Sequence, residues 1–305
     1  MSMGRHLLKP YVIMGIDIQE TSLYISTMKE EVRIKDKVAI VTGGASGIGR
    51  EICLELGRRK AIVIVADINE PGAQKTASEI VASGGRAKPI RLDVSKADEV
   101  QALVDETVRA QGRLDYMFNN AGIAIGCDSR DMTLDRWRRI MDINLWGVIY
   151  GTTAAYQVMT KQGFGHIVNT SSIAGLIPFP IEIGYTTTKF AVVGLSQALR
   201  AEGHDLGVKV SVVCPGVVAT PIYETAELIG ASMDDVMAMN KIKIMPAEKA
   251  ARLILKGVER NRAIIVLPRL WRLLWLVYRL CPSLIGPPMQ KACRDFRALC
   301  KKRLK

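Results

Sequence analysis

The sequence is poor in the side chains that build metal centres and disulfide frameworks. Among its 305 residues are three histidines and six cysteines, with no CxxC pair and no cysteine–histidine clustering of the kind that binds zinc. We therefore expect no metal site and no disulfide framework. Unpaired thiols are typical of a reducing compartment, so we expect a cytoplasmic protein.

Long hydrophobic runs are also missing. No stretch reaches the roughly 18 apolar residues that a transmembrane helix needs. The apolar segment at residues 11–16 is too short for a secretory signal peptide and lacks a cleavage site. Hydrophobic residues still make up 49% of the composition, so the chain has enough of them for a full buried core.

Acidic residues are nearly absent from the C-terminal end. Residues 263–305 hold ten lysines and arginines but a single acid, Asp295, so this segment accounts for most of the net charge of +12. Such a surface suits phosphate-rich partners, anionic lipids among them. We expect no nucleic-acid partner, because no known nucleic-acid recognition module accompanies the charge.

The segment Leu270–Leu280 is predicted to form an amphipathic helix. At about 100° per residue, Arg269, Arg272 and Arg279 fall within an arc of about 80°, and leucine, tryptophan, valine and tyrosine cover the other faces. Such a helix suits a membrane interface, where the protein would bind peripherally. The alternative is a helix docked on its own domain or on a partner subunit.

From Val38 onward, short apolar runs alternate with longer amphipathic segments. Helices are predicted from Gly47 and over Gly72–Ser83, and the predicted strands are Val38–Val41, Ile62–Ala66, Ala87–Leu92, Leu114–Phe118, His166–Thr170, Lys209–Val213 and Ile264–Leu267. This alternation predicts an α/β fold, a Rossmann-type doubly wound parallel sheet in a single domain. We assign residues 35–267 to this catalytic domain, residues 1–34 to an N-terminal extension and residues 268–305 to a basic amphipathic C-terminal tail.

A glycine-rich loop, Thr42–Gly49, follows the first predicted strand and opens the first helix. Glycines there allow a tight turn and a close approach of the backbone to a pyrophosphate, and the helix N-terminus offers free N–H groups. A structural turn is the alternative, but the position between strand and helix favours dinucleotide binding. The residues expected at the cofactor are Gly43, Ser46, Gly47, Ile48 and Gly49.

Asp67 lies at the end of the second predicted strand. A carboxylate at this position accepts hydrogen bonds from the adenosine ribose and repels a 2′-phosphate. The glycine loop has no lysine or arginine before Gly47, where Ser46 stands instead. Both features favour NAD over NADP, although a helix N-cap is an alternative role for Asp67.

Tyr185 and Lys189 stand four residues apart in a predicted helix, so they share one face. The pKa of a free tyrosine is about 10, and a nearby ammonium and the positive ring of an oxidised nicotinamide stabilise its phenolate. Such a tyrosine can take the proton of an alcohol while hydride leaves for the nicotinamide. An ordinary exposed pair is the alternative.

Further motifs follow in order along the chain. They are Asp93-Val94, Asn119-Asn120-Ala121-Gly122, Asn144, Ser172 thirteen residues before Tyr185, Cys214-Pro215-Gly216, and Thr220. With the glycine loop and the Tyr185–Lys189 pair, they resemble the short-chain dehydrogenase/reductase family over about residues 36–267. One departure is Thr187-Thr188, where the family often has Ala-Ser before the lysine.

The resemblance implies a role for each motif. The catalytic residues would be Asn144, Ser172, Tyr185 and Lys189; Ser172 would orient the substrate oxygen, and Lys189 would also contact the nicotinamide ribose. The remaining cofactor-binding residues would be Asp93, Val94, Asn120, Ala121, Gly122, Pro215, Gly216 and Thr220. Of these, Asp93 would contact the adenine and Thr220 the carboxamide. The family resemblance also implies a homodimer or homotetramer.

The segment between Pro221 and Pro246 is expected to be the substrate lid. Its apolar side chains are Ile222, Tyr223, Leu228, Ile229, Met233, Met237, Met239 and Met245. Because methionine lines adaptable hydrophobic pockets, we expect a lipophilic alcohol or ketone as substrate. The alternative is that these side chains only pack the lid on the core.

Together these features predict an NAD(H)-dependent oxidoreductase that interconverts an alcohol and a ketone or aldehyde. A catalytically silent dinucleotide-binding scaffold at a membrane or protein partner is the alternative, and the complete set of four catalytic residues argues against it. An epimerase or dehydratase of sugar nucleotides uses a similar tyrosine and lysine. The compact, apolar region after Pro215 leaves little space for a sugar diphosphate.

Overall fold

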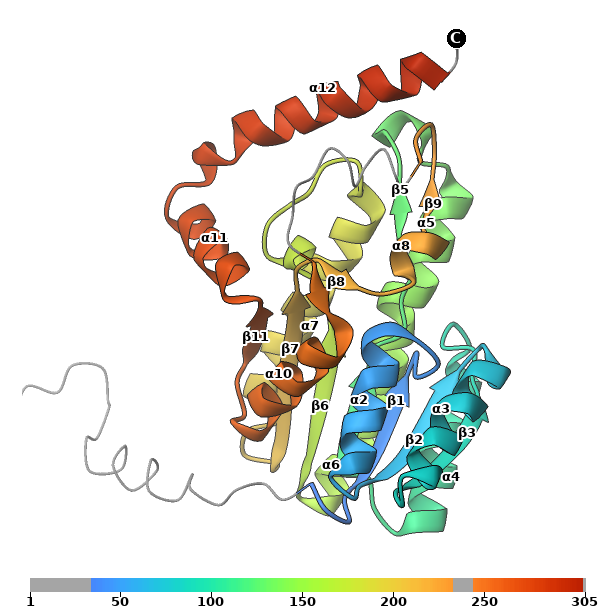
Figure 1. The fold of residues 1–305 in the computed structure, drawn as a ribbon. Helices are drawn as coiled ribbons and strands as arrows, with labels where there is room; N and C mark the ends of the chain where they lie inside the picture. The colour runs from blue at the N-terminus through green and yellow to red at the C-terminus, as the bar shows by residue number, and fades with distance from the viewer. Residues whose placement is uncertain (1–33, 233–243, 304–305) are drawn as a thin grey trace, which may run out of the picture. The chain divides into compact units, whose positions relative to one another are not determined.

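The computed structural model describes residues 34–232 and 244–303 (Figure 1). Seven strands form one sheet in the order β11-β7-β6-β4-β1-β2-β3, and every neighbouring pair is parallel. In chain order the strands are β1 (Val38–Thr42), β2 (Ile62–Asp67), β3 (Arg86–Arg91), β4 (Tyr116–Asn119), β6 (Gly165–Thr170), β7 (Val208–Pro215) and β11 (Ile264–Leu267). The predicted α/β fold is confirmed, with strand ends shifted by at most two residues.

Helices cover both faces of the sheet. On one face lie α2 (Gly47–Arg58), α3 (Glu70–Ala82) and α10 (Ala247–Glu259). On the other lie α4 (Ala97–Gln111), α6 (Gly147–Gln162) and α7 (Ile183–Glu202). Parallel strands covered on both sides are expected to be apolar throughout, and all five residues of β1 are buried.

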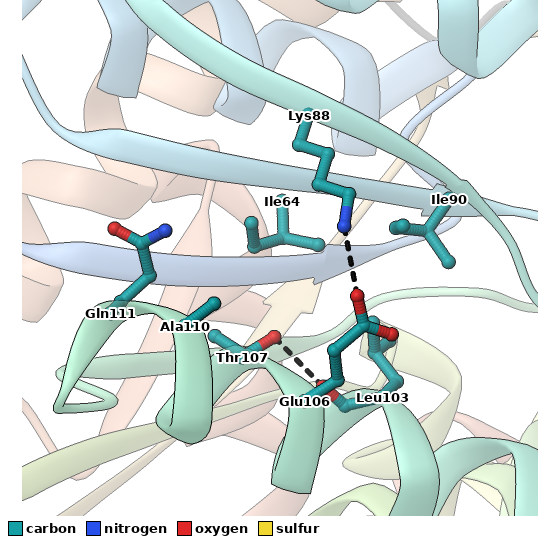
Figure 2. Close-up of a pocket in the computed structure, with 8 residues that line it drawn as sticks. All are labelled: Ile64, Lys88, Ile90, Leu103, Glu106, Thr107, Ala110 and Gln111. Atoms are coloured by element: carbon teal, nitrogen blue, oxygen red, sulfur yellow. Dashed lines mark hydrogen bonds and ion pairs between the residues drawn. The ribbon is translucent and has the colours of Figure 1, made fainter.

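The edge strand β3 departs from this pattern. It alternates charged, exposed residues with partly buried ones and contains Pro89. Charges and proline on an edge strand discourage pairing with another chain. Figure 2 shows a small surface hollow between β3 and α4, bridged by an ion pair of 2.9 Å between Lys88 Nζ and Glu106 Oε1. None of the predicted site residues lines this hollow.

The strand order reverses between β1 and β4. After β1 the chain builds outward through β2 and β3, and then returns to place β4 on the other side of β1. In open parallel sheets, ligands bind beyond the carboxyl ends of the strands at such a switch. The fold therefore directs attention to the loops after β1, β2, β4, β6 and β7.

Short elements surround this end of the sheet. Two small parallel pairs, β5 (Ile125–Gly126) with β9 (Glu227–Leu228) and β8 (Val218–Ala219) with β10 (Met245–Pro246), connect the lid segment to the domain. The lid also contains α8 (Ile222–Thr225), whereas Met233, Met237 and Met239 lie outside the described residues. Further connecting elements are η1 (Ser129–Asp131), α5 (Leu134–Met141), the π-helical turn η2 (Asp142–Trp146) and η3 (Ile173–Gly175).

The C-terminal tail consists of α11 (Arg269–Leu280), η4 (Pro282–Leu284) and α12 (Gly286–Arg303). Trp271 of α11 and Phe296 of α12 are buried, 9% and 2% exposed. Arg297 Nε forms a 2.6 Å ion pair with Asp128 Oδ2, which ties α12 to the loop after β5 (Figure 1). From Ile34 onward the chain, tail included, forms one unit.

The aromatic side chains of α11 agree with the alternative of a docked helix and not with the membrane-facing one. We expected Trp271, Trp275 and Tyr278 to belong to the apolar surface of an amphipathic helix at a membrane. In the structure they pack inward against the core cluster around η3 and β7. Their spacing of four and three residues puts them on one side of the helix, and the body of the protein covers that side. No helix in the described part of the chain is long and apolar enough to cross a membrane.

Candidate functional site

The glycine loop makes a turn that side chains would prevent. Gly43 and Gly47 have positive φ angles of 68° and 53°, a region that residues with a Cβ rarely adopt. A Cβ on Gly49 would collide with the carbonyl oxygen of Gly43. Ser46 is the N-cap of α2, and its side chain makes no capping hydrogen bond, so the first N–H groups of the helix are left for another acceptor. Ile48 stands in the first turn, half-buried.

Asp67 ends β2 beside this loop. Its Oδ2 accepts a hydrogen bond of 2.9 Å from the N–H of Ala45, and its Oδ1 accepts one of 2.9 Å from the N–H of Asn69. The N-cap of α3 is Asn69, whose side chain accepts from Gly72. Asn69, and not Asp67, is therefore the helix N-cap that was considered as an alternative role for Asp67. Each oxygen of Asp67 keeps a further lone pair for a ligand.

Asp93 and Val94 follow β3 at the same end of the sheet. Burial alone would raise the pKa of Asp93, but hydrogen bonds from Ser95 outweigh it and hold the pKa below its usual value. Both Ser95 hydrogen bonds end on Oδ1, at 2.7 Å from Oγ and 3.0 Å from N. Val94 is 9% exposed and packs against Gly147 of α6.

The segment Asn119–Gly122 ties the ends of the two central strands together. The backbone N–H groups of Asn120 and Ala121 both donate to Thr42 Oγ1, at 3.0 and 3.1 Å. The side chain of Asn119 instead turns into the sheet, where its Nδ2 donates to Asn169 Oδ1 at 2.9 Å. The two asparagines therefore differ, because Asn119 supports the sheet interior and Asn120 supports the glycine loop.

Asn144 lies in the π-helical turn η2 and is fully buried. Its Oδ1 accepts from the N–H of Ile123, and its Nδ2 donates to the carbonyl of Ile123, both at 2.8 Å. A Cβ on Gly122 would lie 3.2 Å from Asn144 Oδ1 and 3.6 Å from Lys189 Nζ. Asn144 thus holds the loop after β4 against the lysine. The π-turn, a feature often found at functional sites, was not predicted.

The two serines after β6 have different surroundings. Ser171 is buried, and its hydroxyl donates to the carbonyl of Lys189 at 2.7 Å. Ser172 is half-buried, its Oγ accepts from the N–H of Ala174 at 3.1 Å, and its side chain lowers the pKa of Tyr185. Ser172 therefore lies at the tyrosine, as the resemblance implied, and Ser171 supports the helix.

Tyr185 and Lys189 share one face of α7. Lys189 Nζ lies 5.3 Å from the centre of the Tyr185 ring and donates to the carbonyl of Thr170 at 3.0 Å. Lys189 is 3% exposed, and its burial lowers its pKa to about 8. The alternative of an ordinary exposed pair is therefore wrong.

The pKa of Tyr185 is not lowered by the protein alone. Burial raises it above the usual value, Glu182 raises it further, and the hydrogen bond with Ser172 opposes both effects. The sequence argument relied on a nearby ammonium and on the positive charge of an oxidised nicotinamide. The chain by itself supplies a neutral phenol at neutral pH, which is the form that donates a proton.

Pro215 ends β7, and Gly216 and Thr220 follow it. The Ser172 hydroxyl donates to the carbonyl of Pro215 at 3.5 Å. A Cβ on Gly47 would lie 3.1 Å from the Thr220 side chain, so the segment after β7 reaches the glycine loop. A Cβ on Gly216 would collide with the indole of Trp271, so the tail supports this segment from behind.

Sequence reasoning missed two side chains at the site. Glu182, one residue before α7, and Tyr223 of α8 both interact electrostatically with Tyr185. Tyr223 was counted only as an apolar lid residue, and Glu182 belongs to none of the motifs. Its position three residues before Tyr185 was the available signal, because residues three apart share a face near a helix start.

The described residues contain no group of three histidine, cysteine or acidic side chains that would hold a metal ion. The residues present do fit a dinucleotide. The glycine loop provides a cradle that a Cβ would fill, the N-terminus of α2 faces it, and Asp67 stands at its edge.

Known proteins are similar to this chain in sequence and in fold. Residues 37–228 match the model of the short chain dehydrogenases. The chain is 38% identical over 201 residues to the cyclohexanol dehydrogenase of Acinetobacter sp. strain SE19, covering 65% of this chain and 80% of that protein. It is 36% identical over 187 residues to glucose 1-dehydrogenase 2 of Bacillus subtilis, covering 60% and 72%.

A solved structure extends the likeness to the fold. The short chain dehydrogenase/reductase from Burkholderia phymatum, in complex with NAD, superimposes with a TM-score of 0.76 at 26% identity over 83% of this chain and 96% of that chain. The chain therefore belongs to the short-chain dehydrogenase/reductase family and is an oxidoreductase of the alcohol dehydrogenase type that uses a nicotinamide dinucleotide.

Proposed function

We propose that this chain interconverts a lipophilic alcohol and its ketone or aldehyde with NAD(H), using Tyr185 as the acid/base. The observation that carries the proposal is the convergence of Tyr185, Ser172 and Lys189 beside the glycine loop. The Ser172 side chain acts on Tyr185 and lowers its pKa, so an alcohol oxygen that hydrogen-bonds to both hydroxyls, with Ser172 turned from the Pro215 carbonyl, would take a fixed orientation.

In the oxidation direction, Tyr185 takes the hydroxyl proton of the alcohol, and in reduction it returns that proton. When bound, the nicotinamide dinucleotide accepts or donates the hydride, and its oxidised ring contributes a positive charge. Lys189, held by the Thr170 carbonyl, adds a second positive charge beside the phenol. Asn144 acts on Lys189 indirectly, by fixing the loop after β4 against it.

We assign the cofactor site to the loops at the carboxyl ends of the strands. The pyrophosphate would lie at Gly43, Ser46, Gly47, Ile48 and Gly49, on the N-terminus of α2. The adenosine would lie toward Asp67, Asp93 and Val94, and the nicotinamide side toward Asn120, Ala121, Gly122, Pro215, Gly216 and Thr220. The preference for NAD rests on Asp67, whose carboxylate repels a 2′-phosphate, and on Ser46, which supplies no cation to attract one.

The preference for a lipophilic substrate rests on the lid. Ile222, Leu228, Ile229 and Met245 of the lid lie partly or fully buried around α8 and the short strands, whereas Ile244 is exposed. The test is a panel of steroids, retinoids, long-chain alcohols and small polar alcohols, with turnover followed by the absorbance of reduced nicotinamide. Highest kcat/KM on a small polar alcohol would contradict this preference.

The tail is proposed to contact a membrane surface through a face that the structure leaves uncovered. On a helical wheel of α11, five aliphatic side chains occupy a continuous arc of about 120° away from the buried Trp271. They are Leu270, Leu273, Leu274, Val277 and Leu280, between 36% and 87% exposed. Each leucine or valine that leaves water contributes up to about 1.5–3 kcal/mol.

Basic residues flank this aliphatic arc. Arg269, Arg272 and Arg279 are all exposed, and each contributes about 1 kcal/mol close to an anionic lipid surface. If two copies of the chain met through α11, each helix would present the same arginines and no acidic residue to pair with them. An anionic membrane surface therefore complements this helix better than self-association does.

The rival function, a silent dinucleotide-binding scaffold, predicts cofactor binding without turnover on any alcohol or ketone. The buried Lys189 speaks against it, because burial of an ammonium costs free energy and a scaffold gains nothing from it. We also retain the homodimer or homotetramer as a proposal, which sedimentation equilibrium tests directly.

A further inference from the structure

A group of buried polar side chains lies in the core between the sheet and the helices α6 and α7. They come from four different elements: Asn119 ends β4, Asn169 belongs to β6, Thr152 to α6 and Ser196 to α7. Each is at most 3% exposed. These four residues form the buried network, and none of them is a catalytic or cofactor-binding residue of the proposed mechanism.

Asn169 is at the centre of the buried network. Its Oδ1 accepts from Asn119 Nδ2 at 2.9 Å and from the Thr152 hydroxyl at 3.2 Å. Its Nδ2 donates to Ser196 Oγ at 3.0 Å. The Ser196 hydroxyl in turn donates to the carbonyl of Val192 at 2.7 Å, which leaves its oxygen as the acceptor. Because both ends of the amide group are held, the Asn169 side chain has one orientation and joins α7 to β6.

The buried network costs stability that an apolar core would not. Burial of an amide group without full compensation is unfavourable, and Asn119 Oδ1 is buried with no hydrogen-bond partner among the described residues. The packing around this oxygen is tight, because a Cβ on Gly151 would collide with it. In exchange, a polar network specifies one arrangement of the elements that it joins.

Ser196 shares a face of α7 with the catalytic pair. At about 100° per residue, Tyr185, Lys189 and Ser196 lie within an arc of about 40°. Lys189 and Ser196 are 3% and 1% exposed, and both are hydrogen-bonded to residues of β6. The hydrogen bond from the buried network therefore reaches the face of the helix that carries the chemistry.

β6 and the loop after it bind this face at two separate places. At the site, the Thr170 carbonyl holds the ammonium of Lys189, and the two serines that follow Thr170 act on Lys189 and Tyr185. The hydrogen bond between Asn169 and Ser196 is the other place, about 16 Å from Tyr185 along the helix axis. A rod held at two separate points has a defined position and a defined angle, so this hydrogen bond contributes to both.

We propose that Asn169 is a positioning residue for the reaction. By binding Ser196 it fixes the position and the angle of α7 on β6, and so aligns the Tyr185 phenol with the Ser172 hydroxyl. This assignment rests on the proposed function, which places the substrate oxygen at those two hydroxyls. A shift of α7 by about 1 Å would misplace the proton acceptor, and a misplacement of that size costs up to about 10²-fold in rate.

Two substitutions break the buried network with little change in shape. Ser196→Ala removes the acceptor of the Asn169 amide, and Thr152→Val removes the hydroxyl that holds the amide oxygen. Thr152→Ser is the counterpart of Thr152→Val, because it keeps the hydroxyl and loses a methyl group. The control is Thr107→Val in α4, where a similarly buried hydroxyl donates to the carbonyl of Leu103 inside its own helix.

The experiment measures kcat and KM of the full-length protein with NAD and the alcohol of the panel that the wild type oxidises fastest, and NADH binding by fluorescence. For Ser196→Ala we expect kcat to fall by about tenfold or more. KM of the alcohol and the affinity for NADH should be retained, because the lid and the glycine loop do not belong to the buried network. Thr152→Val should lower kcat to a smaller extent, whereas Thr152→Ser and Thr107→Val should keep the kcat of the wild type.

The outcomes separate this assignment from the proposed function. If the wild type oxidises no alcohol of the panel, both fail. If Ser196→Ala folds and keeps the kcat of the wild type, or loses NADH affinity as strongly as kcat, the assignment fails and the oxidoreductase function stands. If Ser196→Ala does not fold, the Thr152 pair decides: a kcat for Thr152→Val that is no lower than that of Thr152→Ser overturns the assignment.

Discussion

The ammonium of Lys189 lies 5.3 Å from the centre of the Tyr185 ring, with the Thr170 carbonyl holding it there. One helix carries both side chains, and β6 supplies the carbonyl. The position of the charge relative to the phenol therefore depends on how α7 packs on the sheet, and not only on the four-residue spacing.

Replacing Tyr185 with phenylalanine removes the phenol and keeps the ring. We expect kcat to fall by at least about 10²–10⁴-fold, the usual contribution of general acid–base catalysis, while binding of NADH, measured by fluorescence, is retained. Tyr156→Phe, a half-buried tyrosine packed on the α4–α6 side of the core, is the control. Near-normal turnover by purified Tyr185→Phe would refute the mechanism.

Replacing Asp67 tests the cofactor preference. Asp67→Asn keeps an acceptor oxygen for only one of the N–H groups of Ala45 and Asn69, and it removes the charge proposed to repel a 2′-phosphate. We expect the ratio of kcat/KM for NAD over NADP to exceed one in the wild type and to shrink in the variant. A wild-type preference for NADP would show that Asp67 does not exclude the phosphate.

Trp271 anchors the tail on the catalytic domain. Its ring lies 6.1 Å from that of Phe179 in an edge-on arrangement, and its indole fills the space beside Gly216. Trp271→Ala should lower the free energy of unfolding by about 3–5 kcal/mol, seen as a lower melting temperature. Leu280→Ala, on the same helix but 87% exposed, should change it little; equal losses would mean that α11 is not docked as described.

Glu182 gives a pH dependence to stability. Its pKa is raised from 4.5 to about 7, so the stability it contributes is complete below pH 4.5 and is lost as the pH rises through 7. Glu182→Gln cannot ionise, and Tyr185 and Tyr223 beside it stay neutral over this range. The variant should therefore be more stable than the wild type above pH 7, by of order 1 kcal/mol, with no difference near pH 4. A gain that is the same at both pH values would contradict this account.

The membrane proposal is tested on the uncovered face of α11. Because Trp271 is buried, deleting the tail would disturb the fold, so point variants are needed. We expect the wild type to sediment with anionic liposomes, and Leu273→Glu/Val277→Glu to abolish sedimentation at an unchanged melting temperature. Leu206→Glu, an exposed leucine before β7, is the control. Failure of the wild type to sediment would leave α11 as a docked helix only.

The parts of the fold that sequence predicted well are those with a strong local pattern. The strand at Val38–Val41 follows from a local run of apolar residues. The turn at Gly43 and Gly47 follows from the positive φ angles that glycine allows. The relative positions of Ser172 and Tyr185 followed from the family resemblance, since local rules do not relate a strand end to a later helix.

The features that sequence did not reveal depend on tertiary contacts. The π-turn at Asn144 exists because both polar atoms of its side chain bind the backbone of Ile123, 21 residues away. Trp271 turned inward because a glycine at position 216 leaves space for an indole there. Neither relationship produces a periodic signal in the chain.

Trp271 also has a consequence for regulation by binding. The same helix presents Leu273 and Val277 to the outside and the indole to Gly216, a residue proposed to lie at the nicotinamide. If an event at the outer face stabilises the docked helix, it also stabilises the segment after β7. If that stabilisation also raises the affinity for the dinucleotide, thermodynamic reciprocity requires that bound dinucleotide raise the affinity of the outer face for lipid by the same factor. Lipid and cofactor would thus be heterotropic ligands of one protein, joined through a single indole.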